Sequence, residues 1–170
     1  PPANDPNVYY PEIWDPTTEE WTALGPMQVA RVYHSTAILL RDGSVLSAGG
    51  EPHQESSQIF RPPYLCKGPR PTITSAPPTI QLGQSFEVFT PEAPSIAQVN
   101  LLKLGAVTHA YDQSQHIVRL NFVAGVDRVT VDGPTSSYDA LPGYYMLFLV
   151  SDLGVPSIAE YVMVPPEVEW

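Results

Sequence analysis

The chain has few positive charges and a single cysteine. Eight Lys and Arg residues stand against eighteen Asp and Glu residues, which gives a net charge of -10 over 170 residues. Proteins that bind nucleic acid or an anionic membrane surface need clustered positive charge, so the composition argues against both kinds of partner. Cys66 is alone and cannot form an internal disulfide.

Long apolar runs and helical patterns are also missing. No run is long enough for a transmembrane helix, and no stretch keeps apolar residues at the helical period. No signal peptide is visible, and the start at Pro1-Pro2-Ala3 suggests the interior of a longer protein. What the chain does contain is 20 prolines and 11 glycines between short β-type runs. We therefore expect an all-β fold with many turns.

The C-terminal part of the chain has the pattern of a β-sandwich. Short apolar runs recur between turn signals, as is typical of an immunoglobulin-like sandwich of about 100 residues. The alternation of apolar and polar residues is clearest in the second and fourth of these runs. The seven runs are Thr79–Leu82, Ser85–Phe89, Ala97–Leu104, Ile117–Phe122, Arg128–Val131, Tyr144–Val150 and Ala159–Val164.

A phenol and an imidazole stand side by side at Tyr33-His34, just before an apolar β-type run. Oxygen and nitrogen donors of this kind suit Cu(II). Neighbouring side chains of a strand point to opposite faces, so both can meet one ion only if the backbone at Tyr33 has not yet entered the strand. The alternative is that Tyr33 packs and His34 makes a hydrogen bond at the strand start.

The residues around this dipeptide carry a family resemblance. The stretch from Tyr33 to Gly50, with its Asp42-Gly43 turn, resembles the last part of the kelch-type propeller of the copper radical oxidases. These are the galactose oxidase and glyoxal oxidase group. The resemblance covers nearly the whole chain and continues, in the family's order, through Gln58–Leu65, Gly105–His109, Pro142–Phe148 and Gly154–Ser157.

The resemblance implies the end of a kelch-type β-propeller followed by an immunoglobulin-like, early set β-sandwich. Residues 1–60 would form terminal propeller blade segments, 61–71 a proline-rich linker with polyproline II character, and 72–170 the sandwich. Within the first part, Gln58–Phe60 repeats the pattern of Glu12–Trp14. Their separation is close to the roughly 50 residues of a kelch repeat.

A propeller needs at least about three stacked repeats to bury its blade faces. We therefore expect residues 1–60 to have open strand edges and exposed apolar surface. The expected partner is the missing N-terminal propeller portion, from the same precursor or from another chain. The alternative is that these strands pair with the sandwich in a compact fold of their own.

The resemblance also implies a site for one copper ion. Tyr33, His34 and His109 match three of the family's protein ligands, although a loop histidine such as His109 would otherwise be interpreted as simply exposed. Tyr33 matches the axial tyrosine, the catalytic residue that accepts the proton of the substrate hydroxyl. The radical tyrosine and its cross-linked cysteine have no counterpart here; Cys66 matches neither and is interpreted as packing or linker.

Four other polar residues were compared with the family's site. His53 and His116 match no ligand position of the family. Arg31 and Gln113 are possible outer groups that would hold the ligands by hydrogen bonds.

The implied reaction is the two-electron oxidation of a primary alcohol or aldehyde, with O2 reduced to hydrogen peroxide. The substrate would be a small alcohol, an aldehyde or a carbohydrate, and the protein would be secreted. The isolated chain should be inactive because it lacks the radical. The alternative is a non-catalytic kelch-plus-sandwich module that binds carbohydrate or a partner protein.

Overall fold

The computed structural model describes residues 9–50, 54–108 and 111–166. Within these ranges the regular elements are β-strands and short 3-10 turns. All paired strands are antiparallel, and they form five sheets of two to four strands. The predicted all-β fold is confirmed.

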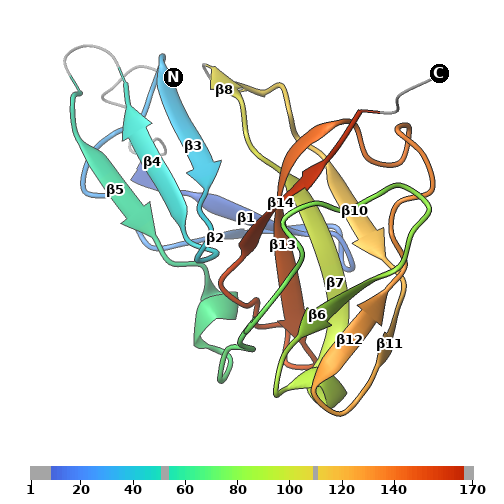
Figure 1. Cartoon of the computed structure of the whole chain (residues 1–170). Coiled ribbons are helices and arrows are strands. Elements are labelled where there is room, and N and C mark those ends of the chain that lie inside the picture. The colour runs from blue at the N-terminus through green and yellow to red at the C-terminus, as the bar shows by residue number, and fades with distance from the viewer. Residues whose placement is uncertain (1–8, 51–53, 109–110, 167–170) are drawn as a thin grey trace.

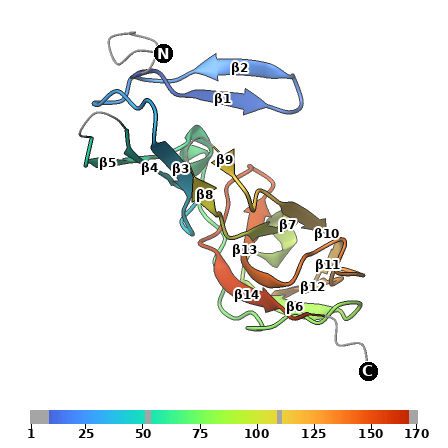
Figure 2. The same ribbon diagram turned by 90° about the horizontal axis from the view of Figure 1, so that it is seen from above.

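The N-terminal part forms two separate sheets. Strands β1 (Glu12–Asp15) and β2 (Glu20–Ala23) make a hairpin, while β3 (Ser35–Leu39), β4 (Val45–Gly49) and β5 (Ser57–Phe60) follow one another in a meander. Figure 2 shows the hairpin lying apart from the meander. The prolines and glycines between these runs explain why each strand is short.

The two N-terminal sheets face each other across an open gap of about 570 Å³. Ile13 and Leu24 line one side of it, and Ala37, Val45 and Phe60 line the other. Within the described part of the chain, no residue of β1 to β5 is buried. In the described residues, these strands pair only with one another and not with the later sheets, so the strand pairing that the alternative requires is not found.

The C-terminal part is a two-sheet sandwich (Figure 1). One sheet has the order β10 (Ile117–Leu120), β7 (Ile96–Lys103), β13 (Gly143–Ser151), β14 (Glu160–Val164). The other has the order β11 (Phe122–Ala124), β12 (Arg128–Val131), β6 (Phe86–Phe89). Alternate residues of both sheets form one core, including Val88, Val99, Leu101, Val129, Val131, Tyr145, Leu147 and Leu149. Buried apolar area of this kind is the main source of a domain's stability.

Two of the predicted sandwich runs differ from the structure. The run Ile117–Phe122 is divided between β10 and β11, which belong to different sheets. The run Thr79–Leu82 forms only one isolated bridge, between Thr79 and Met163. Pro77 and Pro78 lack amide hydrogens for a ladder, and Gly83 at φ +68° ends the segment.

The linker is more structured than polyproline II. It contains a 3-10 turn at Pro63–Cys66 (η2), and its entry residue, Pro62, has polyproline II angles of -60° and 150°. Cys66 is exposed and free, so it does not pack. In the Asp42-Gly43 turn only Gly43 has a positive φ, of 77°, and the Asp42 carboxylate accepts the Ser44 amide hydrogen.

The difference in burial leads to a first prediction. An isolated fragment of residues 72–165 should fold, while an isolated fragment of residues 1–60 should not, because its strands bury too little apolar surface. Amide hydrogen exchange of the two fragments measures this directly. Strong protection across β3 and β4 in the isolated 1–60 fragment would contradict the expectation.

Candidate metal site

Tyr33 and His34 lie in a turn just before β3. The Ser35 amide donates to the Val32 carbonyl over 3.0 Å, and His34 has a positive φ of 61°. This backbone brings the two rings to the same side, with centroids 3.8 Å apart and planes at 31°. Both side chains can meet one ion only if the strand has not yet begun at Tyr33. This condition is met, because β3 begins only at Ser35.

The turn is held in place from the neighbouring strands. Gly49, at the end of β4, pairs with Ser35 and has a φ of +73°. A Cβ atom at Gly49 would lie 2.7 Å from the His34 carbonyl oxygen, so only glycine fits there. Arg31 donates from Nη1 to the carbonyls of Gly49, at 2.7 Å, and Ser56, at 2.8 Å. Arg31 thus holds backbone, not a ring of the candidate site.

Gly49→Ala should loosen this turn. The new methyl group meets the His34 carbonyl, and the left-handed backbone conformation adds a cost of about 1–2 kcal/mol for an L-residue. Amide exchange of Ser35 and its neighbours in β3 and β4 should therefore become faster. Gly83→Ala is the matched control, because Gly83 also has a positive φ but a methyl group there would meet no atom within 4 Å. Equal exchange at β3 in both variants would contradict the close-contact argument.

A hairpin from the C-terminal part lies next to β3. Strands β8 (Val107–Thr108) and β9 (Tyr111–Asp112) pair with each other, and β8 contacts β3 (Figure 2). A pocket of about 420 Å³ separates them, lined by Ser35, Thr36, Ala37, Ser47, Val107, Tyr111, Asp112 and Gln115. His109 lies outside the described residues, but its neighbours in sequence, Thr108 and Tyr111, form the paired ends of this hairpin.

The other polar residues named from the sequence have the following positions. Gln113 has an exposed side chain, and its amide donates to the Ala106 carbonyl over 3.2 Å. Gln115, not Gln113, lines the pocket between β3 and the β8–β9 hairpin, and the sequence did not indicate this. A ring nitrogen of His116 lies 2.9 Å from the Asp139 carbonyl oxygen, away from Tyr33. His53 lies outside the described residues.

The donor set fits copper in part. A phenol oxygen and an imidazole nitrogen on one side of one turn match the N,O preference of Cu(II). Among residues 9–50, 54–108 and 111–166, no group of three or more His, Cys, Asp and Glu side chains gathers. Tyr33 and His34 are therefore the described part of the candidate ligand set.

The chain is similar to known proteins over nearly its whole length. Residues 70–164 match the family model of the galactose oxidase-like early set domain. The chain is 34% identical to an aldehyde oxidase ("Aldehyde oxidase GLOX") of Vitis pseudoreticulata, over 97% of this chain and 35% of that protein. It is 32% identical to a galactose oxidase of Gibberella zeae, over 92% of this chain and 25% of that protein.

A solved structure is similar over almost the same range. It is described as a novel fungal alcohol oxidase with catalytic diversity among the AA5 family, in complex with copper. The TM-score is 0.84 at 29% sequence identity, and the match covers 93% of this chain and 36% of that one. The chain thus spans about a quarter to a third of the length of these relatives.

Proposed function

Because the chain belongs to the galactose oxidase-like early set family, we propose that it is the C-terminal portion of a copper radical oxidase. The proposed reaction converts a primary alcohol to an aldehyde, or an aldehyde to an acid, and reduces O2 to hydrogen peroxide. Its relatives include proteins named aldehyde oxidase and galactose oxidase, which supports the oxidase class.

The arrangement of Tyr33 and His34 is the observation that carries this proposal. Their rings lie 3.8 Å apart on one side of a turn that Gly49 and Arg31 hold. In the proposal, Tyr33, His34 and His109 would hold the copper ion, and the bound ion would supply an electron acceptor and a Lewis acid for a hydroxyl group. Tyr33 then accepts the hydroxyl proton as general base, for which its exposed position leaves access.

The remaining groups would come from outside this chain. The radical tyrosine and its cross-linked cysteine match no residue here, so we assign them to the missing N-terminal propeller portion. We also propose that β1 to β5 are the end of a kelch-type propeller and residues 72–170 the sandwich. Apolar residues line the gap between the two N-terminal sheets. This supports the interpretation that the sheets are incomplete blades, which further strands of the propeller would complete.

Hydrogen peroxide release tests the function. The full-length protein loaded with copper should produce hydrogen peroxide from primary alcohols or aldehydes, while this 170-residue chain should bind copper weakly and produce none. Copper removal by a chelator should abolish the activity, and copper addition should restore it. A full-length protein that binds copper but oxidises no alcohol or aldehyde would contradict the proposal.

One observation favours the second candidate function, a carbohydrate-binding module. Trp14 and Trp21 are direct partners across the β1–β2 hairpin and are 47% and 66% exposed. Exposed aromatic patches often mark binding surfaces. Binding of a sugar by this chain without copper, lost in Trp21→Ala, would favour this function over the oxidase.

We further propose a secreted location, which rests on the family resemblance. In the described part of the chain, no helix is long and apolar enough to cross a membrane.

A further inference from the structure

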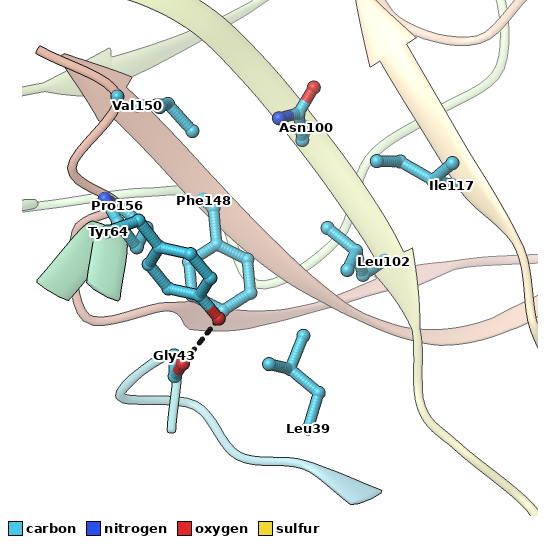
Figure 3. Close-up of a pocket in the computed structure, with 10 residues that line it drawn as sticks. Leu39, Gly43, Tyr64, Asn100, Leu102, Ile117, Phe148, Val150 and Pro156 are labelled. Carbon is cyan, nitrogen blue, oxygen red and sulfur yellow. Dashed lines mark hydrogen bonds between the residues drawn. The ribbon is translucent and has the colours of Figure 1, made fainter. Parts of the chain in front are cut away.

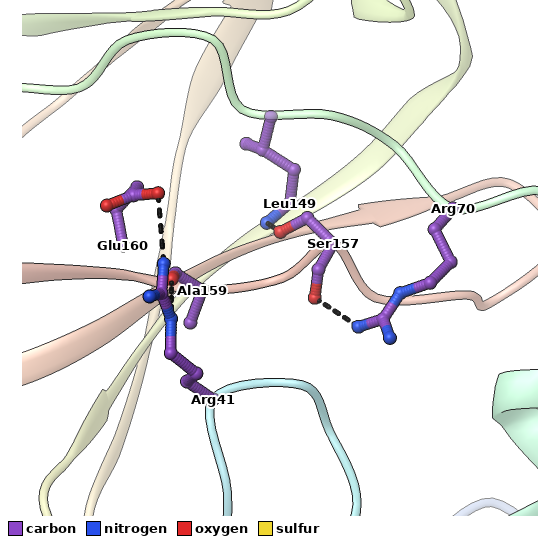
Figure 4. A network of polar contacts seen from close by, with 6 residues as sticks. All are labelled: Arg41, Arg70, Leu149, Ser157, Ala159 and Glu160. Carbon is purple, nitrogen blue, oxygen red and sulfur yellow. Dashed lines mark hydrogen bonds and ion pairs between the residues drawn. The ribbon is translucent and has the colours of Figure 1, made fainter.

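Arg70 joins two sequence motifs that the candidate site leaves unexplained. Its Nε donates to the Pro156 carbonyl over 3.0 Å, in the Gly154–Ser157 motif that follows β13. Its Nη2 donates to the Ser157 carbonyl over 2.8 Å and to the Asp42 carbonyl over 2.7 Å. One guanidinium in the linker therefore bonds the β3–β4 turn to the sandwich (Figure 4 shows the bond to Ser157).

Further hydrogen bonds hold both sides of this contact. Ser157 is fully buried; its hydroxyl accepts the Leu149 amide hydrogen over 3.1 Å, and its own amide donates to the Leu149 carbonyl over 2.7 Å. On the other side, the Tyr64 hydroxyl donates to the Gly43 carbonyl over 2.6 Å (Figure 3). Burial raises the pKa of Tyr64, so this hydroxyl keeps its proton at neutral pH.

A second arginine strengthens the same junction. The Ala159 amide donates to the Arg41 carbonyl over 2.8 Å, and Arg41 Nε donates back to the Ala159 carbonyl over 3.0 Å. Arg41 also pairs with Glu160 at 3.2 Å, but both side chains are about half exposed, so this ion pair adds little. Apolar packing of Leu39 against Met146 and Phe148 lies beside these bonds.

Strand β3 connects the junction to the candidate site. Strand β3 begins directly after Tyr33 and His34, and its far end leads into the turn that Arg70 binds. The β8–β9 hairpin belongs to the C-terminal part and lies against β3, where a Cβ atom at Gly105 would be 3.2 Å from the Ile38 side chain. A rotation at the junction would move this hairpin away from the Tyr33-His34 turn.

We propose that Arg70 is a positioning residue for the copper centre. It fixes the β3–β4 hairpin on the sandwich, so that the β8–β9 hairpin stays beside the strand that follows Tyr33 and His34. The part of this inference that concerns copper rests on the proposed function. A planar guanidinium with several donors suits three carbonyl oxygens in different directions, whereas the ammonium group of lysine would not reach them all.

Calorimetry of the 170-residue chain and copper titration of the full-length protein test the inference together. The original chain should unfold in one transition. Arg70→Ala should give two, the first about 5–10 °C lower, because charged hydrogen bonds across the junction are lost. The copper affinity of the full-length protein with the same substitution should fall about tenfold or more, as for other groups that orient metal ligands. Arg70→Lys should behave similarly, and it replaces Arg70→Ala in both measurements if the alanine variant does not fold.

Arg128→Ala is the matched control. Arg128 pairs with Glu87 and Asp127, both within the sandwich, and its side chain is 40% exposed, so its removal should leave both measurements nearly unchanged. Unaltered unfolding of Arg70→Ala, or altered unfolding with unaltered copper affinity, would overturn the positioning role. A full-length protein that binds no copper would instead overturn the proposed function and leave the junction contact standing.

Discussion

Tyr33→Phe should lower the turnover of the full-length oxidase by about 10²–10⁴-fold, the typical contribution of a positioned general base. The ring and its contact with His34 remain, since phenylalanine differs only by the hydroxyl group. Copper should stay bound through the histidines. Steady-state kinetics with a primary alcohol, together with the copper content of the purified variant, measure the two effects separately.

Tyr111→Phe is a suitable control for this substitution. Tyr111 is 65% exposed, close to the 63% of Tyr33, and lines the neighbouring pocket, but it has no assigned proton to accept. Its variant should keep turnover within a few fold of the original protein. If Tyr33→Phe turns over at the original rate with copper bound, Tyr33 is not the base.

Leu147→Ala should destabilise the chain by about 2–5 kcal/mol, the range for a leucine removed from a packed core. Leu147 is completely buried in β13, between β7 and β14, and belongs to the core that both sheets share. A loss of this size is a large fraction of the stability of an ordinary domain. Urea unfolding followed by circular dichroism measures it.

Leu141→Ala provides the comparison with the same chemical change. Leu141 is 52% exposed, and the Tyr145 hydroxyl bonds its carbonyl, which the substitution retains. The unfolding free energy of its variant should lie within about 0.5 kcal/mol of the original chain, as is usual for surface positions. Similar losses in both variants would mean that the sandwich core does not dominate the stability.

The sandwich could be predicted from the sequence because its apolar residues alternate. The same property explains the error at Ile117–Phe122. Val118, Leu120 and Phe122 all contact the shared core, although the chain passes from one sheet to the other at Asn121. Because both sheets face one core, alternation continues through such a crossing and does not reveal it.

The site could be predicted only in its residue types. The pair Tyr33-His34 indicated N,O donors, but it did not indicate the positive φ of His34 or the close approach of Gly49 from β4 to the His34 carbonyl. The strands β8 and β9 are two residues long, too short to show a period. Arg70 lies in a proline-rich stretch without periodicity, and its three acceptors belong to distant segments.

The nitrogen ligands of the bound copper are the most direct measure of the central claim. Electron paramagnetic resonance of the Cu(II)-loaded full-length protein, with ¹⁵N-labelled histidine, should show two coordinated imidazole nitrogens. His34→Ala and His109→Ala should each remove one of them. A spectrum with the same nitrogen couplings in both variants as in the original protein would contradict the account.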